Sequence, residues 1–371
     1  QTGVNSYKLP YSIKRDILTK CIYGVDKDYN AVEACKFGLL LKLLEDEDVN
    51  TLSAFHPVLP DLNRNIFYGN SLLSPQNVPA ELVEKINPFD FGNLKFDLIV
   101  GNPPYMKTED IKHFSPEEKK LYEKNHLYKS AHKQYDKYFL FIERALTLLE
   151  EDGNLGYIVP SKLMKVGAAR ELRKIISTGK YMKSITSFGA HQVFEDKSTY
   201  TCILILQKKE NNEFSYSEVN GITEWRARNE NEYNVSLRNS SDISETTWVL
   251  CTDRHKSLLD KISLHSKPLG EIVGEDYIFN GIQTSANKVY VFVPLDQDRN
   301  TYTFKAYNGQ TYQIEKAVTK PYFKTTQGVE ALNTYRTFVP NARVVFPYKR
   351  GKNGKLELIS LQTIQHKYPL L

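Results

Sequence analysis

Short apolar runs alternate with longer amphipathic segments over the first 210 residues of the chain. Apolar runs predict strands at 21–26, 65–73, 95–101, 155–160, 184–188 and 201–209. Apolar residues at helical spacing predict helices at 29–44, 134–149 and 168–177. The run at 95–101 is almost wholly apolar, which predicts a strand covered on both faces. This alternation of strands and helices is typical of a doubly wound α/β sheet.

Two segments interrupt or follow this pattern. Residues 106–132 are polar and rich in Lys and Glu, which predicts a mobile loop or lid. Residues 211–245 are rich in Asn, Ser and Glu, which predicts a connector. From residue 246 onward, short segments rich in Tyr, Val, Phe and Thr alternate with turns and predict a mostly β domain. A chain of 371 residues exceeds one ordinary core. We therefore expect domains at 1–210 and 246–371.

Composition excludes several classes of protein. With 41% hydrophobic and 25% charged residues, the chain has the make-up of a globular protein. No apolar run approaches the roughly 18 residues that a membrane span needs, and the start has no secretory signal pattern. The four cysteines are far apart, which predicts free thiols in a reducing cytoplasm and no metal site. They are Cys21, Cys35, Cys202 and Cys251.

The positive charge is unevenly placed. The net charge is +5, but residues from 245 onward carry 17 Lys and Arg against 11 Asp and Glu. The first 244 residues carry 32 against 33. A polyanion would be attracted to the last third of the chain. The alternative is an ordinary solubilising surface.

Three polar residues stand where apolar strands are predicted to end. They are Asp26, Asn70 and Asn102. Ligands of doubly wound sheets bind at the carboxyl ends of strands. We therefore expect the three side chains to share one site.

The turn after the third of these strands, GNPPY at 101–105, carries the most specific chemistry. The side-chain oxygen of Asn102 is a neutral hydrogen-bond acceptor. The carbonyl of Pro103 is a second acceptor, and Pro104 stiffens the backbone that aims it. Two adjacent acceptors suit a substrate that presents two N–H bonds from one nitrogen, as an exocyclic amino group does. The ring of Tyr105 adds a flat face on which a base could stack. The alternative interpretation of GNPPY is a rigid turn that has no catalytic role.

These residues also resemble a known family. FDLIVGNPPY resembles the catalytic motif of S-adenosylmethionine-dependent amino-group methyltransferases, above all the N6-adenine DNA methyltransferases. IYGVDKD resembles the family's second motif, which implies that Asp26 binds the cofactor ribose. A helix cap before Tyr29 is its alternative role. YGNSLL resembles the third motif, with Asn70 in place of the usual Asp that faces the cofactor adenine. The alternative is that Asn70 is an ordinary turn residue.

VFEDKSTYTCILIL resembles the motif that supplies an aromatic residue against the flipped-out target base. Phe194 is the first candidate and Tyr200 the second, with core packing as the alternative. Extrusion of the base is required because the amino group of a paired base is buried in the stack.

The resemblance extends into the last third of the chain. Residues 281–294, 320–326 and 342–354 are similar to the target-recognition region of Type IIG, Eco57I-like restriction–modification enzymes. Their order after the catalytic motifs is the γ arrangement. The resemblance implies contacts to base edges or phosphates from six polar residues. They are Gln283, Thr284, Ser285, Asn287, Lys349 and Arg350.

The family's Gly-rich first motif has no counterpart before IYGVD. We therefore expect the chain to begin inside a Rossmann-like methyltransferase domain, to end inside the recognition region, and to bind S-adenosylmethionine weakly by itself. An N-terminal segment, and a nuclease domain with its Mg²⁺, would lie outside it. The resemblance implies a cytoplasmic prokaryotic enzyme acting on double-stranded DNA, without a membrane partner. Methylation of N4-cytosine, RNA or protein glutamine, or a non-catalytic DNA specificity module, are the alternatives.

Overall fold

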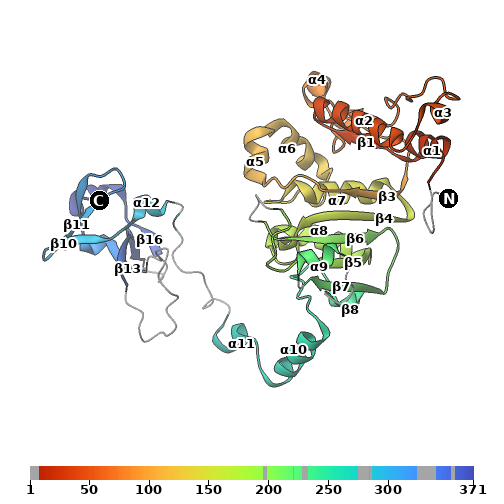
Figure 1. Ribbon diagram of the computed structural model, residues 1–371. Coiled ribbons are helices and arrows are strands. Elements are labelled where there is room, and N and C mark those ends of the chain that lie inside the picture. The colour runs from red at the N-terminus through yellow and green to blue at the C-terminus, as the bar shows by residue number, and fades with distance from the viewer. Residues whose placement is uncertain are drawn as a thin grey trace. The chain divides into compact units, whose positions relative to one another are not determined.

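The computed structural model divides the chain into two compact units, residues 1–265 and 266–371 (Figure 1). No helix among the described residues combines the length and apolar character that a membrane span requires. The same residues contain no group of three or more His, Cys, Asp or Glu side chains arranged for a metal ion. The structure describes residues 8–194, 199–219, 221–227, 233–274, 284, 286–323, 340–351 and 356–371.

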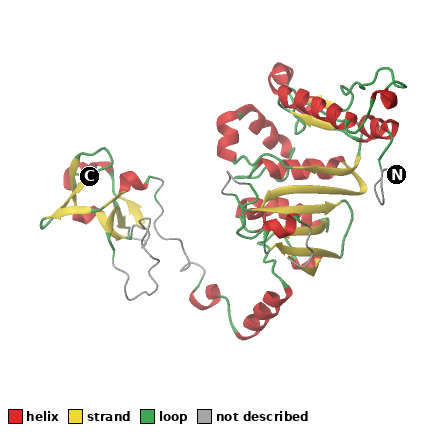
Figure 2. Ribbon diagram, in the orientation of Figure 1, coloured by secondary structure: helices red, strands yellow, loops and turns green. Residues whose placement is uncertain are grey.

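A six-stranded sheet forms the centre of unit 1, with helices packed against it (Figure 2). Its strand order is β3-β4-β6-β5-β7-β8. The parallel pairs are β3 with β4 and β5 with β7, and the other neighbours are antiparallel. The strands are β3 (Phe96–Gly101), β4 (Leu149–Pro160), β5 (Met182–Ser187), β6 (Thr201–Gln207), β7 (Glu213–Val219) and β8 (Tyr233–Asn239). Helices α7 (Lys137–Leu148) and α8 (Arg170–Thr178) bury apolar side chains in the core next to this sheet.

The N-terminal part of unit 1 forms a smaller layer. β1 (Gly24–Asp26) and β2 (Ile66–Tyr68) make a separate two-stranded parallel sheet. Helices α1 (Tyr11–Cys21) and α2 (Tyr29–Leu44) share a core with it. Short helices follow at α3 (Val49–Leu52) and α4 (Val83–Ile86).

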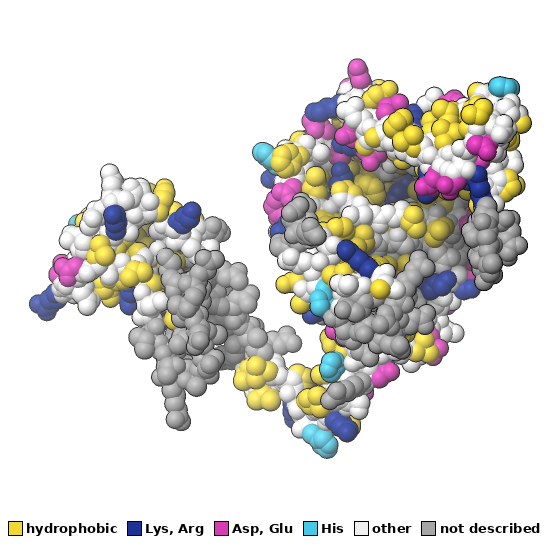
Figure 3. All heavy atoms as spheres, viewed as in Figure 1, with side chains coloured by type: hydrophobic (Ala, Val, Ile, Leu, Met, Phe, Trp, Pro, Cys, Tyr) yellow, Lys and Arg dark blue, Asp and Glu magenta, His cyan; other side chains and the backbone are white. Residues whose placement is uncertain are grey.

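The α/β class is confirmed, but the expectation that β3 is covered on both faces is wrong. β3 is an edge strand whose Leu98 and Val100 are 63% and 71% exposed. Among the described residues no strand pairs with its outer edge, and β1 and β2 pair only with each other. α2 likewise leaves Phe37 and Leu41 exposed. Figure 3 shows hydrophobic side chains gathered on the surface over this N-terminal layer.

Residues 106–132 are not a mobile loop in the structure. They form α5 (Thr108–Phe114) and α6 (Pro116–Glu123) (Figure 1). Ile111, Tyr122 and Tyr128 are buried in the main core of unit 1. A few well-spaced apolar anchors are enough to dock a short helical segment whose other positions are polar.

The segment 211–245, expected as a connector, contains β7, α9 (Ile222–Arg226) and β8. β7 pairs with β5, and β8 pairs with β7 along seven residues. Phe214 and Tyr216 alternate with polar residues, so one face of β7 is buried. α10 (Asp253–His265) then closes unit 1, which extends further along the chain than expected.

Unit 2 is mostly β, as expected. Two three-stranded sheets have the orders β10-β11-β12 and β13-β14-β9, and β15 pairs with β16. The strands are β9 (Val291–Phe292), β10 (Pro294–Gln297), β11 (Thr301–Lys305), β12 (Thr311–Glu315), β13 (Thr319–Tyr322), β14 (Ala342–Val345), β15 (Tyr348–Arg350) and β16 (Leu356–Leu358). The helices are α11 (Leu269–Val273), α12 (Asn287–Tyr290) and α13 (Leu361–Lys367).

Candidate active site

The carboxyl ends of four strands of unit 1 lie at one edge of the six-stranded sheet. β3, β4, β5 and β7 all run in the same direction, because β4 and β5 are each antiparallel to β6. Asn102 follows β3 directly, and Ser161 follows β4. A pocket of about 800 Å³ opens at this edge, with Lys107, Ser161 and Tyr200 among its lining residues. This is the edge at which α/β sheets bind ligands.

Asn102 presents its side chain at the tip of β3. It is exposed, whereas the following Pro103 is buried. The Asn102 amide has no hydrogen-bond partner among the described residues. Its side-chain oxygen is therefore available as an acceptor, as the sequence pattern predicts.

Tyr105 is fixed at its hydroxyl end. The half-buried side chain donates a hydrogen bond from its hydroxyl to the carbonyl of Ile158 on β4, at 3.0 Å. Its ring meets the ring of Tyr138 edge-on, with centroids 5.9 Å apart. Burial raises the pKa of Tyr105 to about 12, so the side chain is neutral at physiological pH. The aromatic ring is held by two neighbouring elements.

The chain after the turn is clamped to the start of α7. The amide of Thr108 donates to the carbonyl of Tyr135 at 3.0 Å, and the amide of Lys137 donates to the carbonyl of Met106 at 2.8 Å. The Thr108 hydroxyl adds a bond to the Tyr135 carbonyl at 2.7 Å. These bonds fix the position of residues 102–105 from their C-terminal side.

Asp26 lies exposed at the carboxyl end of β1. One oxygen, Oδ1, accepts the amide of Asp28 at 2.7 Å. The cap of α2 is Asp28, whose Oδ1 accepts the amide of Asn30 at 2.8 Å. The helix-capping alternative therefore belongs to Asp28, and Asp26 keeps a carboxylate oxygen free at the strand end. A free carboxylate at this position fits the hydroxyl groups of a ribose.

Asn70 has a local structural role. Its side chain is buried, with the residue only 4% exposed, and Oδ1 accepts the amide of Leu72 at 3.2 Å. Its Nδ2 is buried without a hydrogen-bond partner among the described residues. Asn70 and Asp26 lie at the same end of the two-stranded sheet, since Tyr68 pairs with Asp26. The oxygen accepts one bond within the turn and keeps a second lone pair, so the turn role does not exclude a contact with a ligand.

A buried ion cluster connects Lys27, the residue after Asp26, to α6. Glu118 pairs with Lys27 and with Lys137, and accepts the hydroxyl of Tyr122 at 2.8 Å. Burial raises the pKa of Glu118, but Lys137 and Lys27 outweigh burial and hold it below the ordinary value. Burial lowers the pKa of Lys137 despite Glu118. No local sequence signal joins these residues, which are up to 110 positions apart.

The two aromatic candidates differ in position. Phe194 is half-buried in the loop after β5, directly before residues outside the described part of the chain. Tyr200 is largely exposed and lines the 800 Å³ pocket, and its carbonyl accepts the amide of Ser161 at 2.9 Å. Trp248 also lines this pocket, and the sequence reasoning missed it.

The recognition-region candidates lie in unit 2. Thr284 donates its hydroxyl to the side-chain oxygen of Asn287. Lys349 and Arg350 are exposed on β15 and have no ion pair among the described residues. The remaining two candidates, at 283 and 285, fall outside the described residues.

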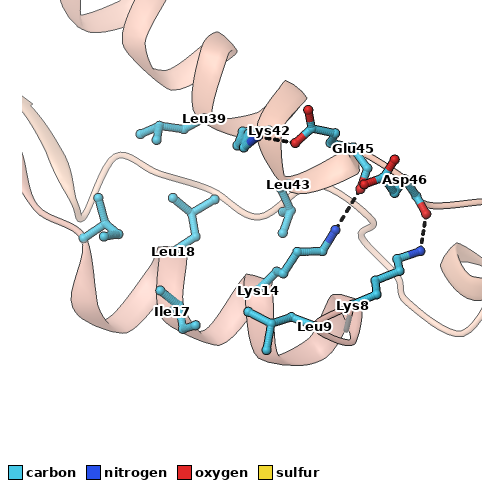
Figure 4. A pocket seen from close by; sticks show the side chains of 11 residues that line it. Lys8, Leu9, Lys14, Ile17, Leu18, Leu39, Lys42, Leu43, Glu45 and Asp46 are labelled. Carbon is cyan, nitrogen blue, oxygen red and sulfur yellow. Dashed lines mark hydrogen bonds and ion pairs between the residues drawn. The ribbon is translucent and has the colours of Figure 1, made fainter. Parts of the chain in front are cut away.

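A second pocket in unit 1, of about 880 Å³, lies between α1 and α2 (Figure 4). Lys14 donates a hydrogen bond to the backbone carbonyl of Glu45 at 2.9 Å, and Lys42 forms an ion pair with the Glu45 carboxylate. The pocket lies at the C-terminal end of α2, whereas Asp26 precedes the N-terminal end. None of the candidate site residues line it. It is therefore separate from the candidate active site.

Comparison with known proteins identifies related enzymes. Residues 20–194 match the family model described as Eco57I restriction-modification methylase. The type II restriction enzyme and methyltransferase RM.Eco57I of Escherichia coli is 45% identical over 100% of this chain and 37% of its own length. The type II methyltransferase M.BstVI of Geobacillus stearothermophilus is 26% identical over 55% of this chain and 39% of its own. The chain thus spans little more than a third of these relatives.

Among solved structures, the type IIG restriction endonuclease BpuSI aligns with a TM-score of 0.40 at 13% identity. The alignment covers 96% of this chain and 47% of that chain. The family resemblance expected from the sequence motifs is confirmed by the family match and by RM.Eco57I.

Proposed function

Because residues 20–194 match the Eco57I restriction-modification methylase family model and the whole chain is 45% identical to RM.Eco57I, we propose that the chain is a methyltransferase of this family and methylates the N6 amino group of adenine in duplex DNA. One observation carries the proposal. Asn102 presents an unpaired amide at the carboxyl end of β3, at the sheet edge where the 800 Å³ pocket opens. A neutral acceptor in that place suits an amino group better than a base or a nucleophile would.

The turn orients the amino group. The Asn102 oxygen and the Pro103 carbonyl accept its two N–H bonds, which takes the nitrogen lone pair out of conjugation with the ring and frees it to form the new N–C bond. The nitrogen then releases one of its two protons to solvent. Tyr105 and Phe194 hold the two faces of the extruded base. Most of the rate enhancement comes from this positioning, because the reaction needs no strong base in the chain.

S-adenosylmethionine, when bound, supplies a methyl group already activated by its sulfonium. Asp26 fits a ribose contact because one carboxylate oxygen is free and exposed. Asn70 contributes to the same region by shaping the turn after β2. Helix α6 contacts the residue after Asp26 through the ion pair of Glu118 with Lys27.

Unit 2 supplies the attraction for DNA. Residues 266–371 carry 14 Lys and Arg against 8 Asp and Glu, whereas residues 1–265 carry 35 against 36. This excess favours a polyanion. Lys349 and Arg350 are exposed and suited to phosphates or base edges. Because RM.Eco57I is described as both a restriction enzyme and a methyltransferase, we extend the proposal to a full-length protein that also cleaves DNA with Mg²⁺.

The test is identification of the methylated product. The full-length protein is incubated with labelled S-adenosylmethionine and plasmid DNA, and the DNA is digested to nucleosides for mass spectrometry. We expect N6-methyldeoxyadenosine. N4-methyldeoxycytidine would contradict the assignment of the base, and DNA binding without any methylated nucleoside would favour a non-catalytic specificity module.

A further inference from the structure

The pocket at the carboxyl edge of unit 1 concentrates positive charge. Unit 1 as a whole carries 35 Lys and Arg against 36 Asp and Glu. The pocket is nevertheless lined by three lysines, Lys107, Lys162 and Lys165, and by a single carboxylate, Glu218. The local field therefore differs in sign from the net charge of the unit.

Two of these lysines are free to meet an anion. Lys162 pairs with the buried carboxylate of Asp136 at 2.8 Å, so its charge is compensated. The exposed side chains of Lys107 and Lys165 form no ion pair among the described residues. Lys107 follows the Asn102–Tyr105 turn by two residues, which links this wall of the pocket to the candidate active site.

The loop that carries Lys165 is held rigidly. The buried guanidinium of Arg173 donates from Nη1 to the carbonyl of Leu163 at 2.7 Å and to that of Val166 at 2.8 Å. The amide of Trp248 donates to the carbonyl of Met164 at 2.8 Å. A buried arginine that binds two carbonyls on either side of Lys165 fixes the loop before any ligand arrives. This preorganisation lowers the entropic cost of binding.

We propose that this pocket binds the sugar–phosphate backbone of the DNA strand that carries the target nucleotide. Lys107 and Lys165 each contact a phosphate, and the exposed ring of Tyr200 packs against the strand between them. The inference rests on the proposed DNA methyl-transfer function and deepens it. It assigns a DNA contact to unit 1, in addition to the charge excess of unit 2. Phosphate contacts of this kind set the register of a strand relative to the reacting base.

The expected effect follows from counterion release. Each phosphate contact contributes about −0.9 to the slope of log affinity against log salt. Loss of one contact therefore weakens DNA binding about fivefold at 150 mM salt and makes the slope shallower by about one. Lys107→Gln and Lys165→Gln remove one such charge each. Lys174→Gln is the matched control, because Lys174 is exposed on α8 and does not line the pocket.

The experiment measures Kd for a linear plasmid fragment between 50 and 300 mM NaCl, and methyl transfer to the same DNA, with the full-length protein. We expect the shallower slope in both pocket variants and the wild-type slope in Lys174→Gln. Equal slopes in all three variants would overturn the inference, even if the wild-type protein transfers methyl groups. A wild-type protein that binds DNA but transfers no methyl group would contradict the proposed function, and the slopes would still decide whether the pocket binds DNA.

Discussion

Replacing Glu118 with Gln tests the buried ion cluster that docks α6. Gln keeps the size of the side chain and still accepts the hydroxyl of Tyr122, so the substitution removes little besides the charge. The Lys137 side chain is 10% exposed and loses its counter-charge, and breaking such a buried pair costs about 3–5 kcal/mol. The Lys27 side chain is 46% exposed, so losing its pair with Glu118 lowers the free energy of unfolding by about 1 kcal/mol or less.

We expect the free energy of unfolding of unit 1 to fall by about 3 kcal/mol, at the lower end of this range. Burial already lowers the pKa of Lys137, so loss of its proton limits the penalty. Urea unfolding followed by tryptophan fluorescence measures the effect, because both tryptophans of the chain, Trp225 and Trp248, lie in unit 1. The matched control is Glu117→Gln, which breaks only an exposed pair with Lys85 and leaves the free energy of unfolding near that of the wild type.

The stability that Glu118 contributes depends on pH, and the pKa shift fixes the direction of this dependence. The folded pKa of Glu118 lies below its ordinary value of about 4.3, so its stabilisation is fully present above that pH. The stabilisation is lost as pH falls through the folded pKa. The contribution of the Glu118 carboxylate is therefore constant from pH 5 to pH 8 and is lost in more acidic buffer. A difference at pH 7 as small as that between wild type and Glu117→Gln would refute the reasoning.

Two further predictions concern the candidate site. Tyr105→Phe removes the bond to the Ile158 carbonyl and lowers the free energy of unfolding by about 1 kcal/mol, but keeps the ring. Methyl transfer then stays near wild type, whereas Tyr105→Ala loses it in a radiolabel assay; equal loss in both variants would contradict a stacking role. Asp28→Ala removes the cap of α2 and costs about 1 kcal/mol in urea unfolding. Asp26→Ala leaves that stability within about 0.5 kcal/mol and weakens S-adenosylmethionine binding in calorimetry of the full-length protein; the reverse pattern would exchange their roles.

Local pattern predicted many of the elements in unit 1. The helix expected at 29–44 has the bounds of α2, and the strand expected at 201–209 is β6, one of the central strands. These segments carry their apolar residues at one clear period. β7 was missed because its buried Phe214 and Tyr216 alternate with Ser and Glu in a segment of polar composition. The period-2 signal was present there but was outweighed by composition.

The sequence predicts the position of a site residue well when that residue directly follows a strand. Asn102 and Asp26 lie at strand ends as expected, and Asn70 was placed correctly but is turned into the protein. The cluster around Glu118 was not predictable, because it joins three elements that are distant in sequence. Long-range ion pairs depend on how elements pack, and the periodicity of a single element carries no information about them.

The most direct test of the central claim is the rate of methyl transfer by Asn102→Ala under single-turnover conditions. The full-length protein is compared with the wild type and with Asn50→Ala, which changes an exposed asparagine on α3. We predict that Asn102→Ala slows transfer by about 100-fold or more, while Kd for DNA stays within about twofold. A rate equal to that of Asn50→Ala, with product formed normally, would contradict the assignment of Asn102 as the acceptor that orients the amino group.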